Sequence, residues 1–228
     1  MARQFIPFTV RGDGLDSHAG LQYEFSVLGM LHSFDQLKVT SVLMKAFRAA
    51  GRDVLVVPYD FTDGPCNAKS RHEWGLFPNK IYFSPSIYYP DGDCVDTGDA
   101  GNSPHEVLCH EMVHALRRAA NTHKKGTKRG WEEKMAIMIT NIFSSETNRP
   151  LRKKHADNSP EKDPKLLTSE GYLAAHPHMI GLFVKQHIAV ATDLSCIDVP
   201  FNPIRAYFHG CAPAWTPAAY QPSANPFR

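Results

Sequence analysis

The sequence predicts an α+β fold in which a small N-terminal sheet precedes a helical part. Short β-branched runs occur before residue 100. A clearly capped helix begins at Pro104, and one or two further helices follow over residues 167–194. At 228 residues the chain can bury a sizeable core, so we expect a single domain. This domain (1–228) comprises a sheet-rich half, a helical half and a Pro/Ala-rich tail, at about residues 1–100, 101–210 and 211–228.

Strand and helix patterns alternate in the first half of the chain. Residues 21–30, LQYEFSVLGM, predict a strand, and residues 33–51 predict a helix with Ser33 as its cap and Gly51 as its stop. The β-branched run DVLVVPYD, residues 53–60, predicts a second strand. These elements give the sheet-rich half a strand–helix–strand order.

A third strand is predicted at residues 80–90, KIYFSPSIYYP, where Pro85 interrupts the pattern. Because proline has no N–H to donate to a neighbouring strand, we place this strand at an edge of the sheet. An exposed edge strand can hold an extended peptide through main-chain hydrogen bonds. This segment is therefore our candidate for the substrate-binding edge.

The segment NSPHEV predicts the start of a long helix. Ser103 suits the N-cap and Pro104 the first helical position. Glu106 suits the third position, where its side chain completes a capping box with Ser103. The residues that follow are mostly apolar, so we predict a largely buried helix from Pro104 to about Ala120.

This helix carries the stretch CHEMVHALRRA, which contains an H-E-x-x-H pattern. His110 and His114 are four residues apart, so their imidazoles lie on one face of the helix and can bind one ion. Two neutral imidazoles, a carboxylate and a water are typical ligands of a catalytic zinc. Glu111 follows the first histidine and is placed to act as general base on the zinc-bound water. We therefore predict a Zn²⁺ site with two histidine ligands and one catalytic glutamate.

The third zinc ligand is expected from a second helix, which begins near Trp131 and runs to about Ser145. Eighteen residues separate His114 from Glu133, which lets an antiparallel helix return a carboxylate to the histidines. We predict Glu133 as this ligand because its face continues with small and apolar residues. Glu132 is the alternative ligand. Both glutamates also suit the first turn of a helix without any metal, because the helix dipole favours negative charge there.

The segments HEMVHALR, EEKMAIMITNIFSSETNRPLRKKH and FNPIR together resemble a group of bacterial effector-type zinc metallopeptidases. This group includes NleD-like type III secretion effectors and the metallopeptidase domain at the C-terminal end of some type VI spike (VgrG) proteins. The resemblance covers about residues 81–205. It implies a zincin-like fold with a gluzincin arrangement, in which a helical glutamate, here Glu133, completes the H-E-x-x-H ligands.

The same resemblance implies a zinc endopeptidase that is delivered into another cell as a toxin-like effector. Its partners would be a protein or peptide substrate, a secretion-system spike or carrier, and a cognate immunity protein. The start of the chain, MARQFIPFTVRGDG, lacks the apolar core of a general secretory signal. We therefore expect export through a signal-independent bacterial secretion system or, otherwise, a cytoplasmic protein.

Composition argues against several other classes. No apolar run approaches the roughly 18 residues of a membrane span. Between Arg117 and Lys165, thirteen Lys and Arg face six Asp and Glu, which suits an acidic partner or a solvated surface. Only Trp131 and Phe143 are aromatic in this span, too few for a platform on which bases stack, so we do not expect nucleic-acid binding. The five cysteines lack C-x-x-C spacing, and a Cys66–Cys94 or Cys196–Cys211 disulfide is compatible with the sequence.

Amide hydrolysis also requires a donor for the oxyanion that forms during the reaction. We predict Tyr207 for this role, with His178, Arg205 and His209 as alternatives. Other polar side chains would orient the metal ligands. For this positioning role we select Asn141, Arg152 and His155.

Two other functions fit the same residues. The zinc could serve hydrolysis of non-protein amide bonds, such as those of cell-wall peptides, or could hold the fold of a non-catalytic metal-binding protein. A structural zinc site has four protein ligands and needs no glutamate beside the first histidine. Glu111 therefore favours a catalytic function over a structural one.

Overall fold

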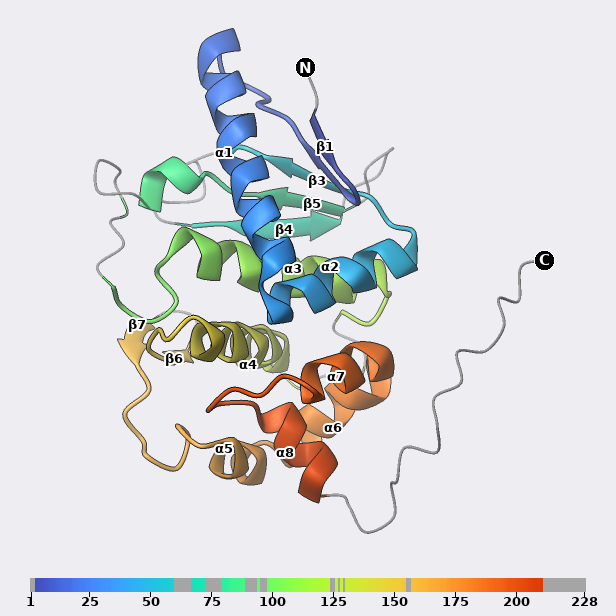
Figure 1. Cartoon of the computed structure of the whole chain (residues 1–228), viewed down its shortest axis with the longest axis vertical. Helices are drawn as coiled ribbons and strands as arrows, with labels where there is room; N and C mark the ends of the chain where they lie inside the picture. Colours follow the sequence, from blue (N-terminus) through green and yellow to red (C-terminus); the bar gives the residue numbers. More distant parts are fainter. Residues whose placement is uncertain are drawn as a thin grey trace, which may run out of the picture.

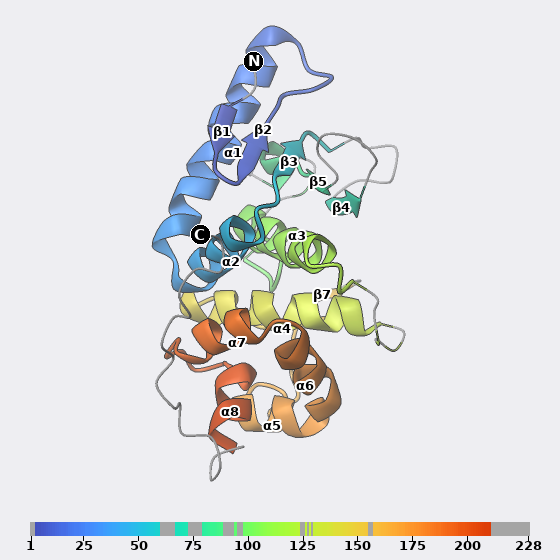
Figure 2. The ribbon, with the colours of Figure 1, turned by 90° about the vertical axis from the view of Figure 1, so that its right-hand side faces the viewer.

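The structure, a computed structural model, describes residues 3–59, 67–72, 79–88, 94, 98–123, 126, 128, 130–154 and 157–210. It confirms the predicted α+β fold, with a sheet formed by N-terminal residues and a helical C-terminal part. The sheet lies at one end of the molecule and the last helices lie at the other (Figures 1 and 2). The predicted tail at 211–228 lies outside the described residues.

The sheet is mixed. Its middle strands run parallel to one another, and each outer strand runs antiparallel to its neighbour. The second predicted strand is confirmed, and all four of its residues are buried. In the described part of the chain, the order across the sheet is β1 (Arg3–Phe5), β2 (Phe8–Val10), β3 (Val54–Val57), β5 (Asn79–Tyr82) and β4 (Lys69–His72).

The edge of the sheet is not the strand that the sequence suggested. Of the strand predicted at residues 80–90 only the first residues are confirmed, as part of β5, and this strand lies between β3 and β4. Pro85 does not interrupt this strand, because it begins a short 3-10 helix, η2 (Pro85–Tyr88). In the described part of the chain the edge strands are β1 and β4, and β4 is a four-residue strand of polar residues that showed no strand pattern.

Helix α1 (Ser17–Gln36) replaces the strand predicted at residues 21–30, so that prediction was wrong. Tyr23, Val27 and Phe34 are buried at helical spacing. The helix begins because Asp16 caps it, with its carboxylate accepting hydrogen bonds from the main chain at 2.9 Å. The alternation of apolar and polar residues in this segment hid a helix that is only partly buried.

Helix α2 (Lys38–Ala50) is separated from α1 by the extended residue Leu37, so Ser33 is not its cap. Its N-terminus is capped from another helix. The two carboxylate oxygens of Glu146 accept hydrogen bonds from the N–H groups of Lys38 (2.7 Å) and Val39 (3.0 Å). Gly51 ends α2 in the left-handed conformation, as predicted.

The two helices that carry the predicted zinc site are confirmed as α3 (Pro104–Ala119) and α4 (Trp131–Glu146). The capping box between Ser103 and Glu106 forms as the sequence predicts. A two-stranded ribbon follows, formed by β6 (Arg152–Lys154) and β7 (Asp157–Pro160). Three helices replace the one or two predicted at 167–194, and a fourth comes after them. They are α5 (Ser169–Ala175), α6 (Pro177–Gln186), α7 (Ile188–Ser195) and α8 (Pro203–Gly210).

The elements form successive layers. The sheet lies above α3, α3 above α4, and α4 above helices α5 to α8 (Figures 1 and 2). Residues of α4 are buried on nearly every side, as its middle position requires. No helix in the described ranges combines the length and apolarity needed to cross a membrane. The metal-site helices therefore lie between the sheet and the C-terminal helices.

One of the two disulfides compatible with the sequence can be assessed. Cys94 is disulfide-bonded, while Cys66 and Cys211 lie outside the described residues. Cys196 is a free thiol, so the Cys196–Cys211 disulfide does not form. Cys109, next to the first histidine, is free and fully buried in the core.

Candidate metal centre

Buried polar contacts hold α3 and α4 antiparallel. At one end, Glu106 accepts a hydrogen bond from Ser144 (2.6 Å) and forms an ion pair with Arg149 (2.8 Å). At the other end, Arg117 of α3 donates two hydrogen bonds to Glu132 of α4 (2.8 and 3.0 Å). Early residues of α3 thus meet late residues of α4. This arrangement brings the start of α4 back to the histidines, as the spacing predicted.

His110, His114 and Glu133 converge on one point. The Nε2 atoms of the two histidines lie 3.1 Å apart. Each of these nitrogens is 3.3 Å from Oε2 of Glu133. Three atoms that can bind a metal therefore form a nearly equilateral triangle between α3 and α4. Ala136, one turn after Glu133, is fully buried and allows the two helices to approach closely here.

The size of this triangle suits a tetrahedral metal ion. Ligand atoms bound to a tetrahedral zinc at about 2.0–2.1 Å lie about 3.3–3.4 Å from one another. The three distances in the structure, 3.1, 3.3 and 3.3 Å, fall close to that value. The histidine side chains are buried, whereas the side chain of Glu133 is 44% exposed. An ion held there would be reached from solvent on the Glu133 side.

The charges around the triangle also suit metal binding. Burial lowers the pKa of His110, which favours the neutral imidazole that a metal needs. Burial acts in the same direction on His114, but the hydrogen bond to Glu133 and the nearby carboxylates outweigh it and raise the pKa. Burial opposes ionisation of Glu133, yet its hydrogen bonds to both histidines dominate and lower its pKa. The carboxylate is therefore ionised and ready to bind a cation.

No protein-family model, curated protein or solved structure matches this chain. The resemblance to effector-type metallopeptidases therefore rests on the sequence segments quoted above. The observation that stands on its own is a His-His-Glu group that could hold a metal ion.

Glu111 lies next to this group and is 5% exposed. Its charge acts on both histidines, and also on Tyr88, Arg118 and Arg152. Among the described residues its carboxylate has no hydrogen-bond partner. Glu111 therefore lies beside the metal ligands without a hydrogen bond to any of them.

Glu132, the alternative third ligand, is engaged elsewhere. Its carboxylate is held by the buried Arg117 guanidinium, which also bonds to Gln186 of α6 at 3.0 Å. His114, His123 and Glu132 form a second group with suitable spacing for a metal. However, the positive charge of Arg117 offsets the charge that Glu132 would offer to a cation. The geometry thus favours Glu133 as the third ligand.

The predicted oxyanion donor is not near the histidines. Tyr207 lies on α8 with its ring against Gly181 of α6. Helix α4 separates α8 from α3 (Figure 2). The alternatives Arg205 and His209 lie on the same helix and contact each other at 3.4 Å, and His178 is exposed on α6. The structure therefore does not bring these four residues to the metal ligands.

Of the three residues predicted to orient the metal ligands, Asn141 and Arg152 are bonded to each other. The side chain of Asn141 exchanges two hydrogen bonds with the main chain of Arg152 (2.9 and 2.8 Å). It thereby fixes β6 against α4 and places Arg152 within electrostatic range of Glu111 and Glu133. Arg152 is thus a neighbour of the site through its charge. His155 lies outside the described residues.

Sequence reasoning missed Tyr88, Arg118 and His123. Arg118 had a usable signal, because it follows His114 by one helical turn on the same face of α3. Tyr88 had none, since it comes from η2, which is distant in the sequence. His123 follows the end of α3, and its ring centroid lies 6.2 Å from that of His114.

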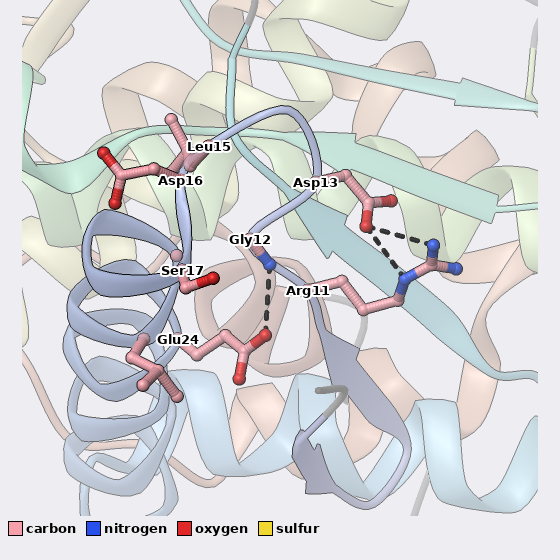
Figure 3. Close-up of a pocket in the computed structure, with 9 residues that line it drawn as sticks. Arg11, Gly12, Asp13, Leu15, Asp16, Ser17 and Glu24 are labelled. Atoms are coloured by element: carbon pink, nitrogen blue, oxygen red, sulfur yellow. Dashed lines mark hydrogen bonds and ion pairs between the residues drawn. The ribbon is translucent and has the colours of Figure 1, made fainter.

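Two cavities in the described part of the molecule are not lined by His110 or His114. One of about 570 Å³ is lined by the loop before α1 and the first turns of that helix. Figure 3 shows Glu24 in this cavity, where it accepts a hydrogen bond from the N–H of Gly12 at 3.2 Å, and an ion pair between Arg11 and Asp13. Another cavity, of about 630 Å³, lies between α5 and α8. The candidate metal centre is distinct from both.

Proposed function

We propose that this protein is a zinc-dependent peptidase. His110, His114 and Glu133 would hold the ion, and Glu111 would act as the general base. The observation that carries the proposal is the triangle of ligand atoms with a partly exposed carboxylate, directly beside a buried glutamate that binds no other described residue. Two imidazoles and one carboxylate match the protein ligands of catalytic zinc sites.

Each residue of the site would have a distinct part in amide hydrolysis. When bound, zinc lowers the pKa of a coordinated water and polarises a carbonyl group. Glu111 would accept a proton from the attacking water on its carboxylate and pass it to the nitrogen of the leaving amine. Tyr88 would donate a hydrogen bond to the developing oxyanion. Burial, and then the charge of Glu111, raise the pKa of Tyr88, so its phenol keeps the proton that it needs for this role.

Two alternatives concern the same site. A non-catalytic metal-binding protein would usually offer four protein ligands, whereas the group here has three members among the described residues. A hydrolase of non-protein amide bonds, such as those of cell-wall peptides, would use the same residues. Comparing hydrolysis of protein with that of cell-wall fragments would separate this alternative from a peptidase.

We also propose delivery into a target cell, with a secretion-system carrier and an immunity protein as partners. This part of the proposal rests on the resemblance of the sequence to effector-type metallopeptidases. Expression inside recipient cells tests it. We expect the wild-type chain to arrest growth and Glu111→Gln to be harmless; equal toxicity of both chains would contradict an enzymatic toxin.

The main test compares the wild-type protein with the variant Glu111→Gln. A second variant, Glu170→Gln on α5, controls for the loss of a carboxylate away from the site. We expect all three proteins to bind stoichiometric zinc. Only Glu111→Gln should lose hydrolysis in a proteome-wide cleavage screen, by a factor on the order of 10²–10⁴, the usual contribution of a general base. Undiminished cleavage by Glu111→Gln, or the absence of bound zinc in the wild type, would refute the proposal.

A further inference from the structure

The second group of possible metal ligands adjoins the candidate metal centre and shares one residue with it. One ring nitrogen each of His114 and His123 and one carboxylate oxygen of Glu132 lie within 4.8 Å of one another. The ring centroids of the two histidines are 6.2 Å apart. Nε2 of His123 lies 4.0 Å from Oε2 of Glu132. His114 therefore belongs to two sets of residues that can bind a metal.

His123 is the member of the second group that solvent reaches most easily. Its side chain is 17% exposed, against 3% for His110 and 6% for His114. Its main-chain N–H donates a hydrogen bond to the carbonyl oxygen of Arg117 at 3.0 Å, which fixes His123 just after the end of α3. An ion from solvent can therefore meet this imidazole before it meets the two buried ones.

The second group is the weaker of the two sets of ligands. Both carboxylate oxygens of Glu132 accept hydrogen bonds from Arg117, at 2.8 and 3.0 Å, and this positive charge opposes the binding of a cation. Its ligand atoms are also spread over as much as 4.8 Å, whereas Glu133 lies 3.3 Å from Nε2 of both His110 and His114. An ion is therefore held less tightly in the second group, as suits a site through which an ion passes.

The shared residue, His114, can bind only one ion at a time. A neutral imidazole offers one nitrogen to a metal, because its other nitrogen carries the proton. Nδ1 of His114 is buried and has no hydrogen-bond partner among the described residues. The second nitrogen of a metal-binding histidine is usually held by a hydrogen bond, so the ring of His114 is less constrained than most such ligands. The two sets of ligands therefore compete for one imidazole that can serve either.

We propose that the second group receives a divalent metal ion from solvent and passes it to the candidate metal centre. His123 and Glu132 bind the ion first and then release it to His110 and Glu133. His114 stays common to both sets, so the transfer exchanges two ligands and keeps the ion within reach of the third. This inference rests on the proposed metal-dependent function, because it names the route by which the centre gains its ion.

Metal uptake by the metal-free protein tests this route without requiring hydrolysis. The probe is Co²⁺, whose visible absorption reports binding in a stopped-flow mixing experiment. We expect His123→Gln to slow uptake roughly tenfold, within the range over which association rates vary among variants of one interface. Release into excess EDTA should slow by the same factor and leave Kd unchanged, because a route serves both directions. His178→Gln, which removes an exposed imidazole from α6, should take up Co²⁺ at the wild-type rate.

The outcomes separate this inference from the proposed function. Uptake by His123→Gln at the wild-type rate would overturn the inference, and so would a weaker Kd with unchanged uptake, which would make His123 a ligand of the resident ion. Uptake that depends on His123, in a protein whose wild type cleaves nothing, would refute the peptidase but keep the route. Absence of Co²⁺ binding by the wild type would refute both.

A second variant keeps the inference testable if His123→Gln fails to fold. Glu132→Gln removes the other ligand that belongs to the second group alone. It should keep the final metal content of the wild type but take up Co²⁺ more slowly. Uptake at the wild-type rate would again overturn the inference.

Discussion

At the residue scale, the adjacent residues Glu132 and Glu133 differ in environment although both begin the same helix. The side chain of Glu132 is 10% exposed and forms an ion pair with the fully buried Arg117. The side chain of Glu133 is 44% exposed and reaches both histidines. Successive helical residues point about 100° apart, which is why one carboxylate holds the helices together and the other faces the metal centre.

Replacing each glutamate should have a different result. Glu133→Gln should lower zinc content sharply with little effect on the metal-free fold, since it removes the ionised ligand. Glu132→Gln should keep zinc but lower the free energy of unfolding by about 3 to 5 kcal/mol, because it leaves Arg117 buried without its counter-ion. Metal analysis and urea denaturation of the two purified variants check this prediction.

A paired replacement controls for the loss of charge at Glu132. Arg117→Met combined with Glu132→Met removes both charges and should recover most of the lost stability. Loss of zinc from Glu132→Gln, with zinc retained in Glu133→Gln, would reverse the assignment of the third ligand.

Tyrosine replacements distinguish the two candidate oxyanion donors. Tyr88→Phe should lower kcat roughly 100-fold with a smaller change in KM, since the hydroxyl acts mainly in the transition state. Tyr207→Phe should behave like the wild type, because Tyr207 packs against Gly181 on the far side of α4. Steady-state kinetics of both variants decide, and the opposite pattern would restore Tyr207 to the role that the sequence suggested.

The residues of the metal centre could be predicted to different extents. His110 and His114 share a helix, so the helical repeat alone places them together. Glu133 required only a return by the next helix, which the loop length allowed. Tyr88 comes from η2, whose position depends on packing between distant elements, and no local pattern encodes that. Tyr207 is the converse case, since a suitable residue type in the right half of the chain lies on α8, which α4 separates from α3.

At the element scale, α2 depends on α4 for its N-terminal cap. The first N–H groups of a helix need acceptors, and Leu37, the residue at the cap position, has no side-chain acceptor. Glu146 supplies both oxygens from the last turn of α4. The start of α2 therefore depends on a contact between residues about a hundred positions apart.

Glu146→Ala should destabilise the protein by about 1 to 2 kcal/mol, the usual cost of a lost cap. Glu170→Ala, which removes an exposed carboxylate from α5, should change stability much less. Urea denaturation provides the measurement, and a Glu146→Ala variant as stable as the Glu170→Ala control would show that water replaces the cap without loss.

Whether an element carries its own start signal explains which elements the sequence could predict. Helix α3 carries its own start signal in Ser103, Pro104 and Glu106, and it was found within one residue. Helix α2 carries no such signal, because its cap is distant in the chain. Strand β4 has mostly polar residues at an edge, so it lacks the apolar alternation by which strands are recognised.

At the scale of the whole molecule, one buried polar group joins the layers. Arg117 of α3 contacts Glu132 of α4 and Gln186 of α6. The hydroxyl oxygen Oγ1 of Thr122, just after α3, lies 2.8 Å from Nε2 of His187. His187 is the residue between α6 and α7. Burial, and then the positive charge of Arg117, lower the pKa of His187 to about 4.

This pKa predicts how stability depends on pH. Because the folded state keeps His187 neutral while the unfolded chain titrates near its ordinary value of about 6.5, protonation favours unfolding. The contribution of neutral His187 to the free energy of unfolding is complete above about pH 6.5. It is lost as the pH falls towards 4, and the total loss is up to about 3 kcal/mol. Urea denaturation of metal-free protein across this range should show a shallower decline for His187→Gln. His178→Gln, at an exposed position on α6, should follow the wild-type curve; an identical curve for His187→Gln would contradict the prediction.

The metal ligands come from two helices, and this has a consequence for the intervening chain. Residues 115–132 link His114 to Glu133, so an ion bound by both would close a loop of eighteen residues. Such an ion would act as a reversible cross-link, which restricts the unfolded chain and opposes separation of α3 from α4. A chelator would then loosen the boundary between the sheet layer and the C-terminal helices, making metal supply a control on the rigidity of the protein as well as on its chemistry.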